Sequence, residues 1–320
     1  MINSLIGNTP MIKVVYDDGG REACVYAKLE QYNLTGSIKD RVAYYILDNA
    51  KKNGMLKPGM PIIEVTSGNT GISLAALGRY YNHPVYIFMP DWVSKERVKL
   101  IGGFGAEVIL ISKEEGGFLK CLEESRKLAL EKGGFLADQF ASKYNFLAHY
   151  ETTAEEILKQ VKEECYGFVS GVGTGGTLMG VGKKLKEKNQ EMKVIAIEPE
   201  KMPMISEGRI IEEHKIEGIG DDFVPDLINR ELIDDMFLIN DDDAVNMSRK
   251  LSKELGLGVG ISSGANLIGC ILARKKHNMP MVTVFADDNK KYLSTDLSKP
   301  ICDDETFISN KIKLKRYEIM

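Results

Sequence analysis

Residues 61–71 read PIIEVTSGNTG, in which a short apolar, β-branched run leads directly into a turn rich in glycine, serine and threonine. The following residues, 72–81, have the pattern of a helix. A strand, a glycine loop and a helix in this order form the first half of a βαβ unit. The stretch therefore predicts an α/β fold.

The alternation of strands and helices continues along the chain. Further apolar runs typical of strands lie at 84–89, 107–111, 167–170, 193–197 and 281–285, and another helix begins at 95–101. Near-continuous apolar strands are typical of parallel sheets that helices cover on both faces. About eight such units predict two three-layer α/β lobes with mostly parallel sheets and a ligand cleft between them.

Two charged segments stand outside this alternation. Residues 183–191 are interpreted as a solvated helix and its exit turn. Residues 300–320 are charged and weakly patterned, so we interpret them as a docking arm or a loose tail.

Composition narrows the class of protein. The chain has 320 residues, of which 43% are apolar and 28% charged, as in an ordinary globular protein. Its formal net charge of −4 argues against nucleic-acid or anionic-membrane partners. The N-terminus has no secretory pattern, and no apolar run is long enough to span a membrane. We therefore expect a cytoplasmic protein with a small-molecule substrate.

Cysteine and histidine show no ligand spacing. The five cysteines are far apart and form no CxxC pair: Cys24, Cys121, Cys165, Cys270 and Cys302. The four histidines are also isolated. The pattern favours reduced thiols over a disulfide framework, and it predicts no bound metal.

The first glycine loop, 65–71, lies between the strand and the helix of the opening stretch. Unpaired N–H groups at a helix start favour an anion, and Thr66, Ser67, Asn69 and Thr70 add polar side chains. A substrate carboxylate would fit there. The same residues also suit an ordinary N-cap and tight turn, so the loop alone leaves both interpretations open.

The second glycine loop, 170–177, reads SGVGTGGT and again joins a strand to a helix. Gly171, Gly173 and Gly176 satisfy GxGxxG, and Glu198 follows at the end of the next strand, so an NAD-dependent oxidoreductase must be considered. Alternatively, the consecutive N–H groups form a cup for one phosphate monoester. Walker A is excluded because no Lys-Ser/Thr pair closes the loop.

Six motifs in a fixed order decide between the dinucleotide site and the phosphate cup. They are LIGNTP at 5–10, SIKDR at 37–41, TSGNTG at 66–71, DQF at 138–140, GTGGT at 173–177 and GISSGAN at 260–266. Together they resemble the cysteine synthase and cystathionine β-synthase family, pyridoxal-phosphate enzymes of the tryptophan-synthase-β fold. The resemblance covers most of residues 3–296.

The resemblance implies a role for each motif. Lys39 resembles the lysine that binds pyridoxal 5′-phosphate as a Schiff base and moves the substrate's α-proton. Asn69 resembles the residue that binds the cofactor's 3′-oxygen. Ser262 resembles the serine that faces the pyridine nitrogen. The implied phosphate cup is Gly173, Thr174, Gly175, Gly176 and Thr177, and the implied substrate-binding set is Thr66, Ser67, Gly68, Thr70, Gln139 and Gly220.

The resemblance also implies the organisation of the molecule. Residues 1–38 and 146–320 would form a larger domain that binds the cofactor and its phosphate, and 39–145 a smaller, mobile, substrate-binding domain. Members of the fold usually form homodimers. Many cysteine synthases bind a serine acetyltransferase, and the residues leave open whether this chain has that partner.

The chain departs from the family at 217–225, EGIGDDFVP. Most cysteine synthases have two small residues where this chain has Asp221 and Asp222, whereas cystathionine β-synthases have tyrosine and aspartate. Asp222 thus aligns with their acid, and Asp221 is peculiar to this chain. Either both aspartates cap a turn, or they are catalytic and take a proton from an incoming water or thiol.

The extra side chains would also leave less room for an acetyl group. We therefore predict β-replacement on a small β-substituted amino acid, most of all L-cysteine. The reaction would release hydrogen sulfide, and either water or a thiol would take its place on the β-carbon. Addition of water would give L-serine. The alternative within the family is O-acetylserine sulfhydrylase, which makes L-cysteine. Two functions of a different class are also weighed: an NAD-dependent oxidoreductase, and a non-catalytic binding relative that would not need Lys39.

Overall fold

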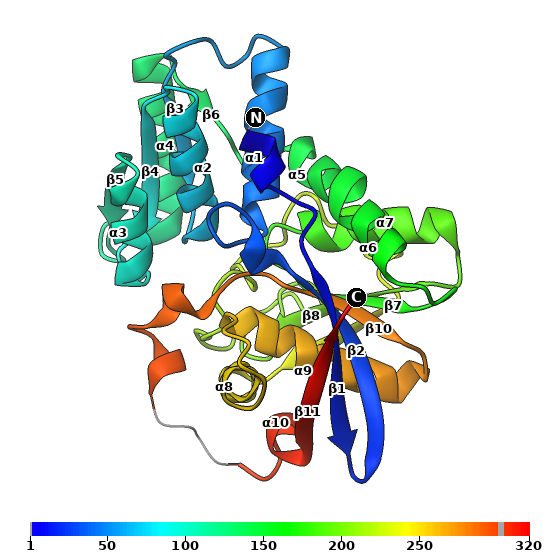
Figure 1. Cartoon of the computed structure of the whole chain (residues 1–320). Coiled ribbons are helices and arrows are strands. Elements are labelled where there is room, and N and C mark those ends of the chain that lie inside the picture. Colours follow the sequence, from blue (N-terminus) through cyan, green and yellow to red (C-terminus); the bar gives the residue numbers. More distant parts are fainter. Residues whose placement is uncertain (1, 300–303) are drawn as a thin grey trace.

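The strands of the computed structural model form two sheets (Figure 1). The structure describes residues 2–299 and 304–320. The larger sheet has the strand order β11-β1-β2-β10-β7-β8-β9, and the smaller sheet has the order β5-β4-β3-β6. The smaller sheet is parallel throughout, and in the larger one β1 pairs antiparallel with β2 and β11 while the other pairs are parallel. The predicted α/β fold with mostly parallel sheets is confirmed.

The strands are short, as is usual in such sheets. Those of the larger sheet are β1 (Met11–Asp18), β2 (Arg21–Leu29), β7 (Gly167–Gly171), β8 (Lys193–Pro199), β9 (Asp235–Ile239), β10 (Met281–Phe285) and β11 (Ile312–Ile319). Those of the smaller sheet are β3 (Ile62–Val65), β4 (Val85–Pro90), β5 (Glu107–Ile111) and β6 (Phe135–Leu136).

Helices connect most of the parallel strands. The α-helices are α1 (Lys39–Lys52), α2 (Asn69–Tyr80), α3 (Lys95–Gly103), α4 (Gly117–Lys132), α5 (Lys143–Ala148), α6 (Ala154–Gln160), α7 (Gly176–Lys188), α8 (Asp241–Leu255), α9 (Ile261–His277) and α10 (Ile308–Lys311). A π-helical turn, η3 (His149–Thr153), joins α5 to α6. The remaining short turns are η1 (Ile2–Leu5), η2 (Glu30–Tyr32), η4 (Arg230–Leu232), η5 (Asn289–Tyr292) and η6 (Asp296–Ser298).

Both faces of the larger sheet are covered, and β8 shows how. Its side chains alternate: Ile195 and Ile197 pack with buried residues of α8 and α9, while Val194 and Ala196 pack with those of α6 and α7. Each fully buried isoleucine or valine of this kind contributes roughly 1.5–3 kcal/mol. The smaller sheet is built in the same way, with Ile62 facing α1 and α2 and Ile63 facing α4. Each sheet is therefore the middle of three layers.

The strands expected from apolar runs at 61–65, 84–89, 107–111, 167–170, 193–197 and 281–285 are present as β3, β4, β5, β7, β8 and β10. The helices expected at 72–81, 95–101 and 183–191 are also present, as α2, α3 and the second half of α7. The hairpin β1–β2, the strand β9 and the short β6 were not predicted. All four cysteines in the described residues are free, and Cys302 lies outside these residues.

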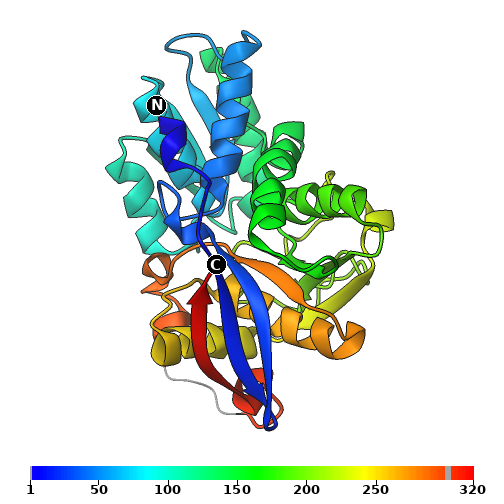
Figure 2. The ribbon, with the colours of Figure 1, turned by 45° about the vertical axis from the view of Figure 1, so that its right-hand side comes forward.

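The prediction of a docking arm or loose tail at 300–320 is wrong for its second half. Residues 312–319 form β11, which pairs antiparallel with β1, so that Ile319 lies opposite Ile12. Figures 1 and 2 show β11 beside the β1–β2 hairpin. Only Ile312 and Leu314 of this strand are buried, so its sequence has little apolar alternation to mark it. Residues 300–303 lie outside the described residues.

The two sheets place the candidate site between them. In Figure 1 the smaller sheet lies at the upper left and the larger sheet below it, with the start of α1 between them. The loops that follow β3 and β7 both begin helices, α2 and α7, at this junction. Within residues 2–299 and 304–320, no helix combines the length and apolarity that crossing a bilayer would require.

Candidate active site

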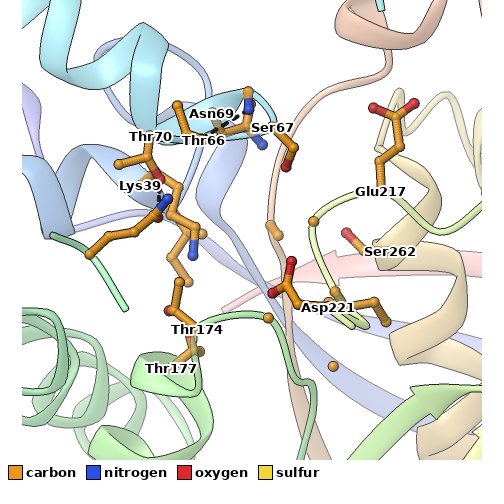
Figure 3. Close-up of a pocket in the computed structure, with 18 of the residues that line it drawn as sticks. Lys39, Thr66, Ser67, Asn69, Thr70, Thr174, Thr177, Glu217, Asp221 and Ser262 are labelled. Carbon is orange, nitrogen blue, oxygen red and sulfur yellow. Dashed lines mark hydrogen bonds between the residues drawn. The ribbon is translucent and has the colours of Figure 1, made fainter. Parts of the chain in front are cut away.

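A cavity opens between the loops of the two sheets (Figure 3). Its empty space amounts to about 930 Å³ with the solvent-open mouth included. It is lined by the loops after β3 and β7, by the first residues of α1 and α9, and by residues 217–219 and 221. A concave site lined by convergent polar groups is typical of small-molecule binding.

Lys39 is the first residue of α1, and its side chain lines the cavity. The backbone before it is fixed, because the N–H of Ile38 donates to the carbonyl of Ala286 at 2.9 Å. Asp40 secures the turn by accepting hydrogen bonds from the N–H and hydroxyl of Thr35, at 2.7 and 2.6 Å. The helix start is thereby anchored on the end of β10, and Lys39 projects into the cavity (Figure 3).

The Lys39 amine is unusual for a lysine. Nζ makes no hydrogen bond with any of the described residues, although it lies in the interior of the cavity. Burial lowers the pKa of this amine, and the nearby carboxylates of Asp221 and Asp287 oppose the shift. A larger share of neutral amine is then present at a given pH than for an exposed lysine, and only the neutral amine can act as nucleophile or base.

The first glycine loop, at the start of α2, is held in shape by its own hydroxyls. Thr66 Oγ1 accepts from the N–H of Gly68 at 3.0 Å, and Thr70 Oγ1 donates to Gln139 Oε1 at 2.6 Å. Gln139 Nε2 in turn donates to the carbonyl of Val65 at 3.1 Å. The arrangement brings the predicted substrate-binding side chains into one wall, with the N-terminus of α2 facing the cavity.

The second glycine loop forms a cup at the start of α7. A Cβ on Gly176 would lie 2.0 Å from Asn145 Oδ1, and one on Gly173 would lie 2.4 Å from the carbonyl oxygen of Gly218. Neither position tolerates a side chain, so the loop backbone is packed tightly on both neighbours. Thr174 Oγ1 accepts from Asn145 Nδ2 at 2.7 Å, and Thr177 Oγ1 lies 3.2 Å from His149 Nε2. The cup therefore presents backbone N–H groups to an anion.

The residues fit pyridoxal phosphate, the cofactor that the resemblance implies. Asn69 Nδ2 donates to Asp287 Oδ2 at 2.7 Å, but its Oδ1 is buried without a hydrogen-bond partner in the described part of the chain. The hydroxyl of Ser262, at the start of α9, also has no partner among those residues and opens onto the cavity. A phosphate cup, an amine, a neutral hydroxyl and an unpartnered amide oxygen thus surround one space, and a phosphorylated pyridine aldehyde has a matching group for each.

Asp221 and Asp222 lie in different surroundings. Asp221 lines the cavity on the side opposite Lys39 (Figure 3), whereas Asp222 is exposed and lies outside the lining. Burial raises the pKa of Asp221 to about 6, with a further contribution from the negative charge of Asp222 and opposition from Lys39. A carboxyl group with this pKa can both accept and return a proton near neutral pH.

Glu198, which completes the nominal dinucleotide fingerprint, is occupied elsewhere. It is buried, and its two carboxylate oxygens accept from the N–H groups of Ile205 and Ser206 at 2.6 and 2.9 Å. It therefore shapes the turn after β8, and its oxygens are not free to bind the hydroxyls of a ribose. This removes the feature that favoured the NAD-dependent oxidoreductase.

The cavity contains most, but not all, of the predicted site residues. Those that line it are Lys39, Thr66, Ser67, Gly68, Asn69, Thr70, Gln139, Gly173, Thr174, Gly175, Thr177, Asp221 and Ser262. Asp222, Gly176 and Gly220 do not line it, although both glycines shape the loops that do. The sequence prediction missed Arg97, Phe118 and Tyr292. No local signal distinguishes these residues, since each lies in a stretch that reads as an ordinary helix or loop.

Comparison with known proteins supports the same chemistry. A family model described as "Pyridoxal-phosphate dependent enzyme" matches residues 2–287. A cysteine synthase of Staphylococcus aureus is 39% identical over 301 residues, which cover 92% of this chain and 96% of the relative.

Solved structures agree in fold. The crystal structure of a hydrogen sulfide-producing enzyme from Fusobacterium nucleatum has a TM-score of 0.96 and 46% identity, and the alignment covers 100% of this chain and 97% of the other. An aspartate-to-asparagine variant of a hydrogen sulfide-producing enzyme, crystallised with an α-aminoacrylate intermediate, has a TM-score of 0.95 and 46% identity, with coverage of 98% and 96%.

Proposed function

The chain belongs to the pyridoxal-phosphate dependent enzymes of the cysteine synthase family, and on this premise we propose that it catalyses β-replacement on L-cysteine. The reaction releases hydrogen sulfide, and water adds in its place to give L-serine. A thiol in place of water gives a thioether amino acid. The observation that carries the proposal is Asp221, a carboxyl group with a pKa raised to about 6 that faces Lys39 across the cavity.

Residues on both sides of the cavity would hold the cofactor. Residues 173–177 would bind its phosphate, Ser262 would lie at its ring nitrogen, and Lys39 would hold its aldehyde carbon. When bound, pyridoxal phosphate acts as an electron sink for the substrate's Cα, which allows a β-substituent to leave. Because Ser262 is neutral, it would not protonate the ring nitrogen. The cofactor would then accept electrons from Cα less strongly, which favours loss of a β-substituent over more demanding carbanion chemistry.

The substrate is oriented by the first glycine loop. Its carboxylate binds to the N–H groups at the start of α2 and to the side chains of Thr66, Ser67, Thr70 and Gln139. Lys39 would also be the base that acts on the substrate's Cα. Its buried amine, with a lowered pKa, removes the Cα proton as the sulfur leaves.

Asp221 supplies the second half of the reaction. A water molecule is a poor nucleophile, and a carboxylate next to the substrate's Cβ removes one of its protons as the C–O bond forms. The hydrosulfide ion of an ordinary cysteine synthase reaction needs no such base, because it is already ionised. The position of Asp221 therefore supports water or a thiol as the nucleophile.

The product distribution from L-cysteine tests the proposal. We would incubate the purified holoenzyme with L-cysteine alone and quantify sulfide, L-serine, pyruvate and lanthionine. We expect sulfide and serine in equal amounts, or lanthionine if a second cysteine is the nucleophile. If cysteine is not turned over while O-acetylserine and sulfide give L-cysteine, the proposal is overturned in favour of ordinary cysteine synthesis, the activity named for the S. aureus relative.

We also propose the domain division that the resemblance implies. All strands of the smaller sheet fall within residues 39–145, and all strands of the larger sheet fall within 1–38 and 146–320. This separation supports a smaller substrate-binding domain that moves against a larger cofactor-binding domain. Hydrogen exchange with and without L-serine would test it, with protection expected at the junctions of the two segments.

A further inference from the structure

Arg97, on α3, is a buried arginine that the proposed mechanism does not use. Its side chain is 2% exposed and lines the cavity. Nη1 forms an ion pair with Glu217, which lies before Asp221 on the loop of the larger sheet, and it also donates to Ser94 Oγ at 3.3 Å. The pair therefore joins the helix after β4 to the segment that carries Asp221.

Arg97 also contacts the substrate-binding loop. A Cβ on Gly68 would lie 2.1 Å from Cδ of Arg97 and 2.3 Å from its Nε, so the arginine stem lies directly on the backbone of this glycine. The guanidinium carbon lies 4.6 Å from the centre of the Tyr292 ring, and Nε is buried with no hydrogen-bond partner in the described residues. One side chain thus touches the loop proposed to bind the substrate carboxylate and the loop that bears the proposed base.

Backbone contacts hold the loop from His214 to Asp221, which carries both Glu217 and Asp221. His214 Nε2 lies 2.7 Å from the carbonyl oxygen of Gly220, and the N–H of Gly220 donates to the carbonyl of Val172 at 2.8 Å. Gly218 and Gly220 both have left-handed backbone angles, with φ of +94° and +72°. The segment is therefore a compact turn, and Figure 3 shows Glu217 and Asp221 across the cavity from Lys39.

A second contact fixes the other end of this segment. The ring of Phe223 stacks on Phe118 of α4, with centroids 6.3 Å apart, and meets Phe140 edge-on at 5.1 Å. Asp221 is thus placed between an ion pair on one side and an aromatic contact on the other, both made with elements around the smaller sheet.

We propose that Arg97 is a positioning residue: through its ion pair with Glu217, it keeps Asp221 at a fixed position relative to the substrate-binding loop. This inference rests on the proposed function. Proton removal at Cα and departure of sulfide need only Lys39 and the cofactor, whereas addition of water needs Asp221 beside the substrate's Cβ. Loss of the ion pair should therefore impair the second half of the reaction and spare the first.

The balance of products reports this difference. In the complete reaction, L-cysteine and water give L-serine and hydrogen sulfide. When water does not add at Cβ, the three-carbon fragment leaves and is hydrolysed, so that L-cysteine and water give pyruvate, ammonia and hydrogen sulfide. The ratio of serine to pyruvate separates a misplaced base from a general loss of activity.

The experiment compares Glu217→Gln and Arg97→Lys with the wild-type holoenzyme and with Glu213→Gln as matched control. Glu213 lies on the same segment and pairs with Lys113, but both side chains are largely exposed and neither lines the cavity. We would measure sulfide in the first turnover by rapid quench, and serine and pyruvate in the steady state. Because the Glu217 side chain is 28% exposed, Glu217→Gln is expected to fold even if Arg97→Lys does not.

We expect Glu217→Gln to lower steady-state serine formation at least about tenfold, since a shift of about 1 Å in a catalytic group can cost 10²-fold. First-turnover sulfide should be unchanged, pyruvate should rise relative to serine, and Glu213→Gln should match the wild type. An unchanged serine-to-pyruvate ratio, or an equal fall in first-turnover sulfide and serine, would overturn the inference. If the wild type itself releases no sulfide from cysteine, it is the proposed function that fails, and that is seen before any variant is made.

Discussion

Lys39 and Arg41 lie on the same first turn of α1, and the polar groups around them are arranged in opposite ways. Arg41 is 1% exposed, and its guanidinium forms hydrogen-bonded ion pairs with Glu30 and Glu156 at 2.6 to 2.9 Å. Lys28 completes the group by pairing with Glu156 at 2.7 Å. Two buried cations thus face two acids, and the charges of this cluster balance within the chain.

The cavity beside it is not balanced in this way. Asn69 Oδ1, Arg97 Nε and Asp287 Oδ1 are buried without hydrogen-bond partners among the described residues, and Lys39 Nζ has none either. A buried polar atom without a partner costs about 1–3 kcal/mol. Such a cost is tolerated where a ligand supplies the missing partner. The comparison therefore separates the charges that hold the fold from the polar groups that surround the ligand cavity.

The largest expected effect is on activity, at Lys39. Lys39→Ala should lower sulfide release from cysteine by at least about 10³-fold, because it removes both the group that binds the cofactor and the base. Stability should not fall, since the amine has no hydrogen bond to lose. Sulfide assays would measure the loss of activity, and urea unfolding of the apoprotein would measure the free energy of unfolding. A large loss of stability would place Lys39 with Arg41 as a structural charge.

Arg41 should show the reverse pattern. Arg41→Met leaves the buried Glu30 and the partly buried Glu156 with one cation between them, and removal of one partner from a buried pair typically costs 3–5 kcal/mol. Urea unfolding of Arg41→Met would measure this, with Arg126→Met as control. Arg126 is exposed on α4, and its loss should change the free energy of unfolding by less than about 0.5 kcal/mol. Similar values for the two variants would refute a structural role for the cluster.

The next effect is a pH dependence set by Asp221. Because burial raises the pKa of Asp221 to about 6 and only the carboxylate form accepts a proton, serine formation should be lost as pH falls through this value. Below it, the steady-state rate should fall about tenfold per pH unit, while first-turnover sulfide should not follow this slope. A rate of serine formation that stays flat down to about pH 5 would contradict Asp221 as the base.

The comparison also explains what the sequence could predict. The strands β3 and β7 and the loops after them were predictable because an apolar run, glycines and a helix pattern occur together within each stretch. Lys39 was predictable only through the order of the motifs, since a lone lysine after a turn carries no chemical signal. Arg41 belongs to the same SIKDR motif, yet its cluster with Glu30 and Glu156 joins segments far apart in the chain, and no local pattern reveals it.

Other features depend on tertiary contacts in the same way. Arg97 lies in SKERVKL, which reads as an exposed amphipathic helix, and its burial follows from the approach of Gly68 and Tyr292. β11 has only two buried side chains and owes its place to backbone pairing with β1. The sequence also does not distinguish Asp221 from Asp222, because only the backbone turn at Gly220 decides which of two adjacent side chains faces the cavity.

The smallest expected effect lies at Asp222. Its side chain is exposed and does not line the cavity, so Asp222→Asn should change serine formation at neutral pH by less than about fivefold, the equivalent of about 1 kcal/mol for an exposed charge. Because the charge of Asp222 helps to raise the pKa of Asp221, its removal should move the acid limb of the pH profile to lower pH. A pH series with Asp222→Asn and Asp221→Asn measures this. If Asp222→Asn instead abolished the reaction and Asp221→Asn did not, the base would be the aspartate that aligns with the acid of the cystathionine β-synthases, and the cavity-facing side chain would only shape the site.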